Sequence, residues 1–541
     1  MTDAPITLTR PRGGLLSGRL SLTRGLVVVG GLILLAALFG RIMEFGIRRD
    51  EMLFVAPAVL LETDALYTDF FYNHLPYSAW LFRASALVFG DLGILFSARL
   101  AVFAGWLLLL GATFWSVHRL SSSTALSGLI VVALITNETL LGQSGMAASN
   151  NLLPSAFSVV ALGLFLTEIV EGRARFLPIF AAGLCLSIAV GMKVSAVAIL
   201  PPLIIAAFLL PRELTFGARV MRVVLPALIG GLIGAIPLFI ELIQNPDVFI
   251  AHVVGFHTGP HVAYWDAFKH TEPDLAMDPR GKLMLAYAGW LSGSALLIAL
   301  VTVAAGWGLM ARRTPGLHVG AVLTVLAVLL ASMAMSFVPT PGFPQYFSAP
   351  IMFLPFLTAL LVRPLSEDQR AYLLPTIAAS VLLMLLLALP RLAPGLMALS
   401  APERTQVAEM AEGGAGIALA LSDAGLIGEG PVATFMPLYP LEANLPVYPE
   451  LATGQFAYRI ADFLTPELGQ HYVVAGPDEM IAMFDTNPPA AFLLGYEPAL
   501  EAPLRAYADA NDYVPVPVEG ISNRYGDGVL LIRNTEGALR E

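Results

Sequence analysis

Long apolar runs separated by short polar stretches dominate the first 390 residues of the chain. About twenty apolar residues are enough to cross a bilayer as a helix. Runs of this kind lie near 26–42, 97–117, 124–141, 152–170, 176–191, 194–210, 220–243, 284–309, 317–338, 346–362 and 371–389, with 176–210 the hardest stretch to divide. Helices are predicted because backbone groups in lipid must bond within their own segment. The pattern therefore predicts a mainly α, polytopic membrane bundle of about eleven transmembrane helices.

The pattern changes in the last third of the chain, where the apolar runs are short. Runs at 432–435, 472–475, 492–495 and 529–532 alternate with helix-like stretches near 403–425, 478–485 and 500–510. This alternation is typical of a small soluble α/β domain. We therefore predict a transmembrane domain over residues 1–390, with long outside loops at 43–96 and 244–283, and a soluble domain over residues 391–541.

Composition supports a membrane location and excludes several functions. The chain is 57% hydrophobic and 13% charged, whereas soluble proteins carry about 25% charged residues. The net charge of −10 comes from the acidic last third, and no basic cluster indicates nucleic acid binding. The single cysteine, Cys185, can form neither an internal disulfide nor a zinc site of its own. The sequence implies no particular cofactor and leaves a divalent metal ion as an open alternative.

The distribution of arginines predicts the orientation of the bundle. An N-terminus inside places four N-terminal arginines and the arginines of 119, 173–175, 212–222, 312–313 and 363–370 in cytoplasmic loops. The opposite loops at 142–151 and 339–345 are nearly free of basic residues, as the positive-inside rule requires. The apolar run after the N-terminal arginines lacks a cleavage site and is interpreted as an uncleaved first helix. An odd number of helices then puts the C-terminal region outside.

Polar side chains are densest in the first outside loop. It contains Arg48-Arg49-Asp50-Glu51, followed by Asp64, Asp69, Tyr72, Asn73 and His74. Acidic residues at a membrane boundary are often there only for solvation. However, Asp50 and Glu51 directly precede the apolar stretch 52–58, and desolvation raises the pKa of a carboxylate and makes it a better base. Short apolar stretches at 57–61 and 77–89 suit helices that lie in the membrane interface.

These residues and several later motifs carry a resemblance to a known superfamily. Asp50-Glu51, the stretch 67–76, Trp80-Leu81, Ala98-Arg99-Leu100 and 191–196 occur in that order. Together they resemble the C-type glycosyltransferases, most closely the protein O-mannosyltransferases and aminoarabinose transferases, over residues 25–360. Pro344-Gln345-Tyr346 is similar to an outside motif of the same enzymes, but Gln345 stands where they have a basic residue, which weakens a phosphate role there.

The resemblance implies an inverting glycosyltransferase that uses a polyprenyl-phosphate sugar. The enzyme is expected in membrane lipid, as in the bacterial inner membrane, with an extracytoplasmic glycan, lipid or protein acceptor. Asp50 would be the general base, and Glu51 would position the acceptor or support Asp50. The resemblance and the loop positions imply substrate contacts from Lys193, His74, Tyr72, Asp69, Tyr346 and His257. Lys193 lies in a long apolar stretch, where a lysine is costly and usually functional, unless it reaches the headgroups.

Several alternatives stay open at this point. His257 and His261 have the spacing of metal ligands on a helix, but Gly259-Pro260 between them favours a turn. Asn150 and Asn151 would either contact the sugar or cap a helix, with capping favoured. Tyr264-Trp265 would either stack on a sugar face or form part of an interfacial aromatic belt, with the belt favoured. The loop 448–456 would be either a lid or a packing loop. A membrane transporter and a lipid-linked polysaccharide polymerase or ligase are the competing functions.

Overall fold

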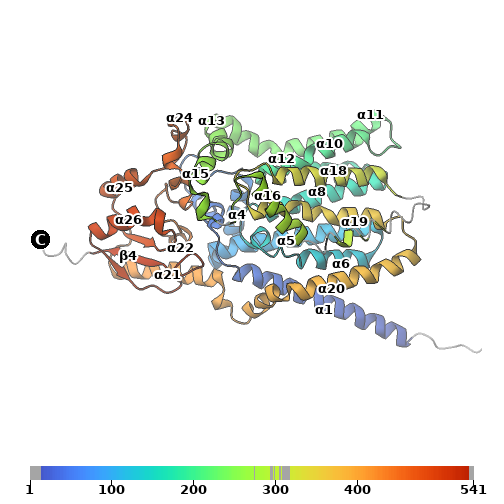
Figure 1. Cartoon of the computed structure of the whole chain (residues 1–541), viewed down its shortest axis with the longest axis horizontal. Coiled ribbons are helices and arrows are strands. Elements are labelled where there is room, and N and C mark those ends of the chain that lie inside the picture. The colour runs from blue at the N-terminus through green and yellow to red at the C-terminus, as the bar shows by residue number, and fades with distance from the viewer. Residues whose placement is uncertain are drawn as a thin grey trace, which may run out of the picture.

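A helical bundle and a small mixed sheet lie at opposite ends of the elongated molecule (Figure 1). The computed structural model describes residues 14–534 except 273, 293–296, 298, 302, 304–305 and 307–316, with side chains from residue 25 onward. Short helices and loops fill the space between the bundle and the sheet (Figure 1). The division into a transmembrane domain over residues 1–390 and a soluble domain over residues 391–541 stays a prediction.

The described residues contain seven helical segments long and apolar enough to cross a membrane. They lie within α1 (Gly14–Glu44), α5 (Ile94–Ser121), α8 (Leu152–Val170), α11 to α12 (Phe216–Gln244), α18 (Val319–Ser336), the segment Pro344–Val362 that ends in α19 (Leu354–Val362), and α20 (Glu367–Ala398). Shorter apolar helices are α6 (Thr124–Ile135), α9 (Phe176–Met192) and the stretch Val194–Leu209, which ends in α10 (Leu200–Leu209). A mainly helical, multi-pass membrane protein is thus confirmed. Part of the predicted 284–309 span lies outside the described residues, so the count of about eleven stays a prediction.

Small residues allow the helices of the bundle to pack closely. A Cβ atom on Gly40 of α1 would lie 1.8 Å from the carbonyl oxygen of Gly395 in α20. Between α9 and α12, a Cβ atom on Gly183 would lie 2.0 Å from the carbonyl oxygen of Ala227. Apolar burial gives helices in lipid little reason to associate, so this close backbone contact supplies much of the attraction. The contact between Gly40 and Gly395 brings α1 and α20 side by side, although they are the first and the last of the long apolar helices along the chain (Figure 1).

The two long outside loops fold into short helices between the bundle and the sheet (Figure 1). The first loop contains α2 (Arg49–Val55), α3 (Pro57–Leu60) and α4 (Tyr77–Phe89). The second contains α13 (Pro246–Ile250), α14 (Phe256–Thr258), α15 (Pro260–Phe268) and α16 (Pro279–Ala286). The predicted helices at 57–61 and 77–89 are therefore present.

The C-terminal end contains a four-stranded sheet in the order β1-β2-β4-β3. Its strands are β1 (Val432–Thr434), β2 (Ala491–Leu494), β3 (Tyr513–Val516) and β4 (Val529–Arg533). The β1–β2 pair is parallel and the other two pairs are antiparallel. Helices α21 (Gln406–Asp423), α25 (Pro477–Thr486) and α26 (Pro498–Ala510) accompany it. The sequence pattern predicted three of these strands and all three helices.

The prediction of a strand at 472–475 is wrong, and β3 was missed. Tyr472 instead donates a hydrogen bond from its hydroxyl to the carbonyl oxygen of Ala251 (2.7 Å), and its ring packs against His252. Tyr472 therefore packs against the second outside loop and does not join the sheet. Pro515 interrupts the apolar pattern of β3, and proline is tolerated there because β3 lies at the edge of the sheet.

The C-terminal end is fastened to the bundle by hydrogen bonds at helix termini. Glu442, which ends α22 (Leu438–Glu442), accepts hydrogen bonds from the backbone N–H groups of Ile94 and Leu95, each at 2.8 Å. These groups begin α5 and have no partner within the helix. A carboxylate at this position also complements the positive end of the helix dipole. The boundary between the two parts is spanned by α20, which continues to Ala398.

Candidate active site

The described residues enclose a large cavity where the bundle meets the outside loops and the sheet. Its volume is about 1160 Å³. The wall is built from α2, the segment 138–158, the segment 193–199, the second outside loop, the segment 332–353 and the C-terminal residues Phe456, Arg459, Arg524 and Tyr525. Polar and charged side chains face it together with apolar ones. Each segment that the sequence predicts to be outside therefore contributes residues to the wall of this cavity.

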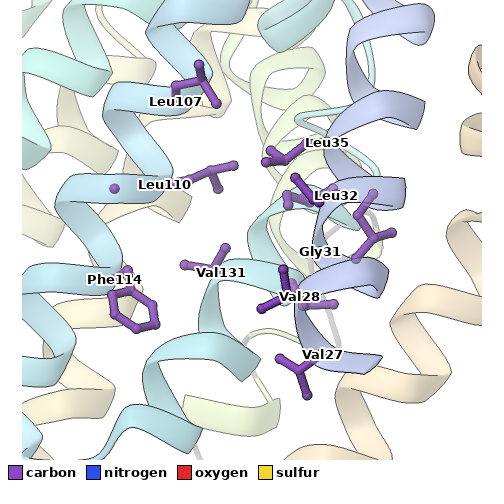
Figure 2. A pocket seen from close by; sticks show the side chains of 13 residues that line it. Val27, Val28, Gly31, Leu32, Leu35, Leu107, Leu110, Phe114 and Val131 are labelled. Atoms are coloured by element: carbon purple, nitrogen blue, oxygen red, sulfur yellow. The ribbon is translucent and has the colours of Figure 1, made fainter. Parts of the chain in front are cut away.

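A second hollow in the bundle has a different character. It is a groove of about 390 Å³ between α1, α5 and α6. Figure 2 shows side chains such as Leu32, Leu110, Phe114 and Val131 pointing into it. Every residue that lines it is apolar. The groove offers no group for acid–base chemistry or charge binding, so the candidate active site is the larger cavity.

Asp50 projects into the cavity from the first turn of α2. The side-chain amide Nε2 of Gln143 donates a hydrogen bond to its Oδ2 atom at 2.9 Å. Burial raises the pKa of Asp50, and this effect exceeds the opposing effects of the Gln143 hydrogen bond and the positive charges of Lys193 and Arg459. A buried carboxylate of raised pKa is a stronger proton acceptor than an exposed one.

Glu51, the next residue, lies behind the cavity wall. Its carboxylate accepts hydrogen bonds from Arg99 Nε and Nη2, each at 3.0 Å, and both side chains are 0% exposed. It also accepts from the backbone N–H groups of Arg48 and Ala148, each at 2.9 Å. Adjacent residues of a helix do not face the same way. The Asp-Glu pair is thus split into one group in the cavity and one in the protein core.

Arg99 joins three segments around Glu51. Besides holding Glu51, its Nη1 atom donates to the carbonyl oxygens of Ile42 at 3.0 Å and Met43 at 3.2 Å. These carbonyls lie in the last turn of α1, where they have no partner within the helix. The motif Ala98-Arg99-Leu100 therefore fixes the end of α1, the start of α5 and α2 relative to one another.

Lys193 lies on the cavity wall immediately after α9. Its backbone is extended (φ −150°, ψ 121°), which turns the chain from α9 into the following 3-10 helix, Val194–Ile199. Nζ donates a hydrogen bond to Oδ1 of Asn151 at 2.6 Å and lies 5.1 Å from the ring centroid of Tyr346. The structure therefore brings three predicted site residues, Asp50, Lys193 and Tyr346, to one cavity.

The expectation that Asn151 caps a helix is wrong. Asn151 stands at the N-cap position of α8 without a side-chain capping hydrogen bond. Its Oδ1 atom accepts from Lys193, and its Nδ2 atom donates to Ser149 Oγ at 2.8 Å. The Asn151 side chain therefore accepts its hydrogen bond from the Lys193 ammonium and not from a backbone N–H group of α8.

Three histidines gather at one side of the cavity. The ring centroids of His74 and His257 are 5.1 Å apart, and those of His257 and His261 are 5.8 Å apart. Burial is the main cause that lowers the pKa of each imidazole. For His74 and His261, the charges of neighbouring basic groups lower the pKa further. The lowered pKa values favour the neutral form of each ring. In the part of the chain described here, no three His, Cys, Asp or Glu side chains are arranged to hold a metal ion.

Two residues expected to contact substrate do not line the cavity. Asp69 accepts a hydrogen bond from the backbone N–H of Ala65 at 2.7 Å and closes an exposed turn. Tyr72 is buried behind the wall, with its ring against Phe54 and His74. His74, His257 and Tyr346 line the cavity, and substrate contact by each of them stays a prediction. Proximity in sequence to Asp50 was therefore a poor guide to which residues of the first loop face the cavity.

Arg459 is a cavity residue that the sequence did not indicate. Its guanidinium lies over three aromatic rings, 4.6 Å from Phe456, 5.0 Å from Trp265 and 5.3 Å from Tyr264. Its side chain forms no ion pair within the described residues, and burial lowers its pKa to about 10. Tyr264 and Trp265 are buried against this arginine.

The loop 448–456 contacts both the first outside loop and the cavity. Thr453 Oγ donates to the carbonyl oxygen of Phe71 at 3.0 Å, and Phe456 lines the cavity. Nearby, Arg49 forms ion pairs with Glu272 (3.0 Å) and Glu497 and lies over the ring of Tyr525. These contacts join the first loop, the second loop and the C-terminal end at the cavity rim.

Comparisons with known proteins show a structural similarity without a sequence match. No protein-family model matches the sequence, and no curated protein sequence does. The crystal structure of ArnT from Cupriavidus metallidurans in the apo state is similar over 94% of this chain and 98% of ArnT, with a TM-score of 0.59 and 16% identity. ArnT bound to undecaprenyl phosphate is similar over 96% and 99%, with a TM-score of 0.57 and 16% identity. At this identity the similarity shows the fold alone.

Proposed function

We propose that this chain, which has the fold of the C-type glycosyltransferases as represented by ArnT, is an integral membrane glycosyltransferase. It moves a sugar from a polyprenyl-phosphate carrier to an extracytoplasmic acceptor, with Asp50 as the general base. The observation that carries this proposal is the placement of a partly buried carboxylate and a partly buried lysine, Asp50 and Lys193, in one cavity. A base and a cation are the two groups that displacement of a phosphate leaving group requires.

The proposed reaction is a single displacement at the anomeric carbon. An acceptor hydroxyl or amine attacks this carbon from the face opposite the phosphate, so that a new bond forms as the bond to the phosphate oxygen breaks, with inversion. Asp50 takes the acceptor proton. Lys193 and Arg459 stabilise the negative charge that develops on the departing phosphate. Tyr346 orients Lys193 through the contact between the ammonium and the aromatic face.

Glu51 has a positioning role in this proposal. Its four hydrogen bonds hold the first turn of α2, which carries Asp50. A catalytic group must be held close to its productive geometry, and loss of that geometry costs rate even when the group itself is intact. Glu51 therefore supports Asp50 through the backbone, and its side chain does not contact the acceptor.

The undecaprenyl phosphate in the ArnT structure supports a carrier lipid of the same class here. That protein has a similar fold over nearly its whole length, and a fold alone does not determine a ligand. The cavity adds independent support, because its charged groups lie where the apolar helices end and the outside loops begin. A lipid phosphate would place its head group there and leave its chain in the bilayer.

The orientation proposed from the sequence fits the arrangement of the basic loops. Arg119 pairs with Glu171, and Arg363 donates to the carbonyl oxygen of Leu120 at 2.9 Å. The loops that contain them therefore gather at one end of the bundle, away from the cavity and the sheet. The positive-inside rule places this end in the cytoplasm. We propose an extracytoplasmic active site and C-terminal domain in the bacterial inner membrane. An alkaline phosphatase fused to the C-terminus should be active, and an inactive fusion would contradict this orientation.

The test of function is sugar transfer by the purified protein in nanodiscs. Donors with the same labelled sugar on polyprenyl phosphate, polyprenyl diphosphate and a nucleotide are offered with glycan, lipid and peptide acceptors. The proposal expects transfer from polyprenyl phosphate, with stoichiometric release of the lipid phosphate. Transfer only from the diphosphate would favour a polymerase or ligase, and movement of uncleaved donor across the bilayer would favour a transporter.

A further inference from the structure

The segment 143–151 connects the proposed base with the proposed cation. It begins with the short helix α7 (Gln143–Met146) and ends at the start of α8. Gln143 at its first position donates to Asp50 at 2.9 Å, and Asn151 at its last position accepts from Lys193 at 2.6 Å. Asp50 and Lys193 are far apart in the sequence, so this segment links them through one hydrogen bond at each of its ends.

The same segment is fixed to the protein core between these two contacts. Trp106 Nε1 donates to the carbonyl oxygen of Gly145 at 2.8 Å, and the backbone N–H of Ala148 donates to Glu51 at 2.9 Å. A Cβ atom at Gly145 would lie 2.2 Å from the carbonyl oxygen of Leu140. Both ends of the segment are therefore attached to a backbone that has little room to move.

We infer that the segment 143–151 sets the geometry of the transfer site, with Gln143 as the positioning residue of Asp50 and Asn151 as the positioning residue of Lys193. This inference rests on the proposed function, because it assigns to these amides the orientation of the base and of the cation. Neither asparagine nor glutamine takes part in proton transfer. Each holds a reacting or charge-binding group by one hydrogen bond.

The contact at Asp50 determines which carboxylate oxygen takes the proton. Gln143 occupies Oδ2, and no other hydrogen bond to the Asp50 side chain occurs within the described ranges. Oδ1 is thus the oxygen left for the acceptor. An amide donor also favours the ionised carboxylate, and it does so without adding charge to the cavity.

The other groups near Asp50 have opposing effects on its ionisation. Burial and the negative charge of Glu51 raise the pKa of Asp50, whereas the positive charges of Lys193 and Arg459 lower it. Tyr346 and Tyr525 line the same cavity, and the negative charge of Asp50 contributes to raising the pKa of each phenol. Among the lowering influences, the Gln143 hydrogen bond is the largest. Its removal should therefore raise the pKa of Asp50.

The contact at Lys193 positions a cation without neutralising it. Asn151 accepts from the ammonium through Oδ1, while its own amide donates to Ser149 Oγ, which fixes the orientation of the side chain. A carboxylate in the place of Asn151 would pair with the lysine and compete with a phosphate. A neutral acceptor leaves the positive charge available to an anionic ligand.

Gln143→Leu and Asn151→Leu test the two ends of the segment separately. For Gln143→Leu, the acid limb of the kcat/KM profile should move up by about one pH unit, because a hydrogen bond to a charged group is lost. The rate deficit should be greatest at low pH and should disappear as Asp50 becomes ionised at higher pH. For Asn151→Leu, the KM for the donor should rise about tenfold, with a smaller change in kcat. Gln470→Leu is the matched control, since Gln470 is exposed in the C-terminal region.

A readout independent of turnover separates this inference from the proposed function. The infrared carboxyl stretch of protonated Asp50, assigned by difference from Asp50→Asn, is titrated in wild type, Gln143→Leu and Gln143→Glu. Both variants should titrate at higher pH than wild type even if no sugar transfer is found with any donor. An unchanged titration in both variants overturns the role of Gln143, whatever the assay of function shows. A rate loss equal at every pH, with a lowered unfolding midpoint, overturns it as well by indicating structural damage.

Discussion

The two hollows of the membrane part differ in the side chains that line them. The groove between α1, α5 and α6 is lined by apolar residues alone (Figure 2). The cavity near the sheet is lined by Asp50, Lys193, Arg459 and three histidines as well as apolar residues. The first offers only apolar contacts, whereas the second contains groups that are costly to bury.

The cost of these buried charges is informative. An ionised group in an apolar environment is stable only when it is paired, hydrogen-bonded or solvated by a ligand or water. Glu51 and Arg99 satisfy this condition behind the cavity wall by pairing with each other. Lys193 and Arg459 have no carboxylate within ion-pair distance among the residues described. The difference separates charges that hold the structure together from charges that are available to an anionic ligand.

The largest effect is expected when the cavity loses its base. Asp50→Asn keeps the shape of the side chain but cannot accept a proton, so sugar transfer should fall by about 10²- to 10⁴-fold. Asp64→Asn and Asp69→Asn should change the rate much less, since neither residue lines the cavity. Initial rates of transfer at saturating donor measure this difference. Turnover close to wild type in Asp50→Asn would contradict the role of Asp50 as the general base. Equal losses of rate in the three variants would indicate a damaged loop.

A loss of stability is expected when the charge pair behind the wall is broken. Arg99→Leu leaves Glu51 buried without its partner and should lower the free energy of unfolding by about 3–5 kcal/mol. Arg83→Leu is the matched control, because Arg83 pairs with the exposed Glu62 at 3.5 Å, and such pairs contribute less than about 1 kcal/mol. Unfolding in detergent, followed by tryptophan fluorescence, compares the two. Equal destabilisation would contradict a core role for Arg99.

A change in donor affinity is expected when the cavity loses its lysine. Lys193→Met keeps the length of the side chain and removes the charge, so the KM for the lipid-phosphate donor should rise by about tenfold to a hundredfold. The unfolding midpoint should be preserved or raised, because no buried charge is left unpaired. Equilibrium binding of polyprenyl phosphate, without sugar, tests the same point. Unchanged binding would show that Lys193 does not bind the lipid phosphate and would leave Arg459 as the only proposed cation for it.

The smallest effect is expected in the apolar groove. Phe114→Leu alters a side chain that points into it (Figure 2), and lipid chains should adapt to the new shape. Transfer rate and donor KM should stay within about twofold of wild type. A strong effect on donor binding would show that the groove holds part of the carrier lipid. The groove and the cavity would then bind different parts of the same donor.

The sequence predicted the groups of the site better than their arrangement. Apolar runs indicated the spans because a helix in lipid must be apolar along its whole length. Asp50 and Lys193 were recognised because ionisable residues are rare beside such runs. Gln143 and Arg459 were missed because an amide or an arginine in an outside loop is ordinary, and only contacts between distant segments give them a role. Asp69 and Tyr72 were expected in the site because they follow Asp50 closely, although the loop turns their side chains elsewhere.

The contribution of Arg459, Arg524 and Tyr525 to the cavity has a consequence for biosynthesis. Chains are made from the N-terminus at about 5–20 residues per second, so the carboxylate and the lysine enter the membrane well before the last part of the wall exists. The wall of the cavity is complete only when the final segment has been made and has folded against the bundle. A nascent polypeptide therefore lacks these three side chains of the cavity wall until its last segment has been made and has folded.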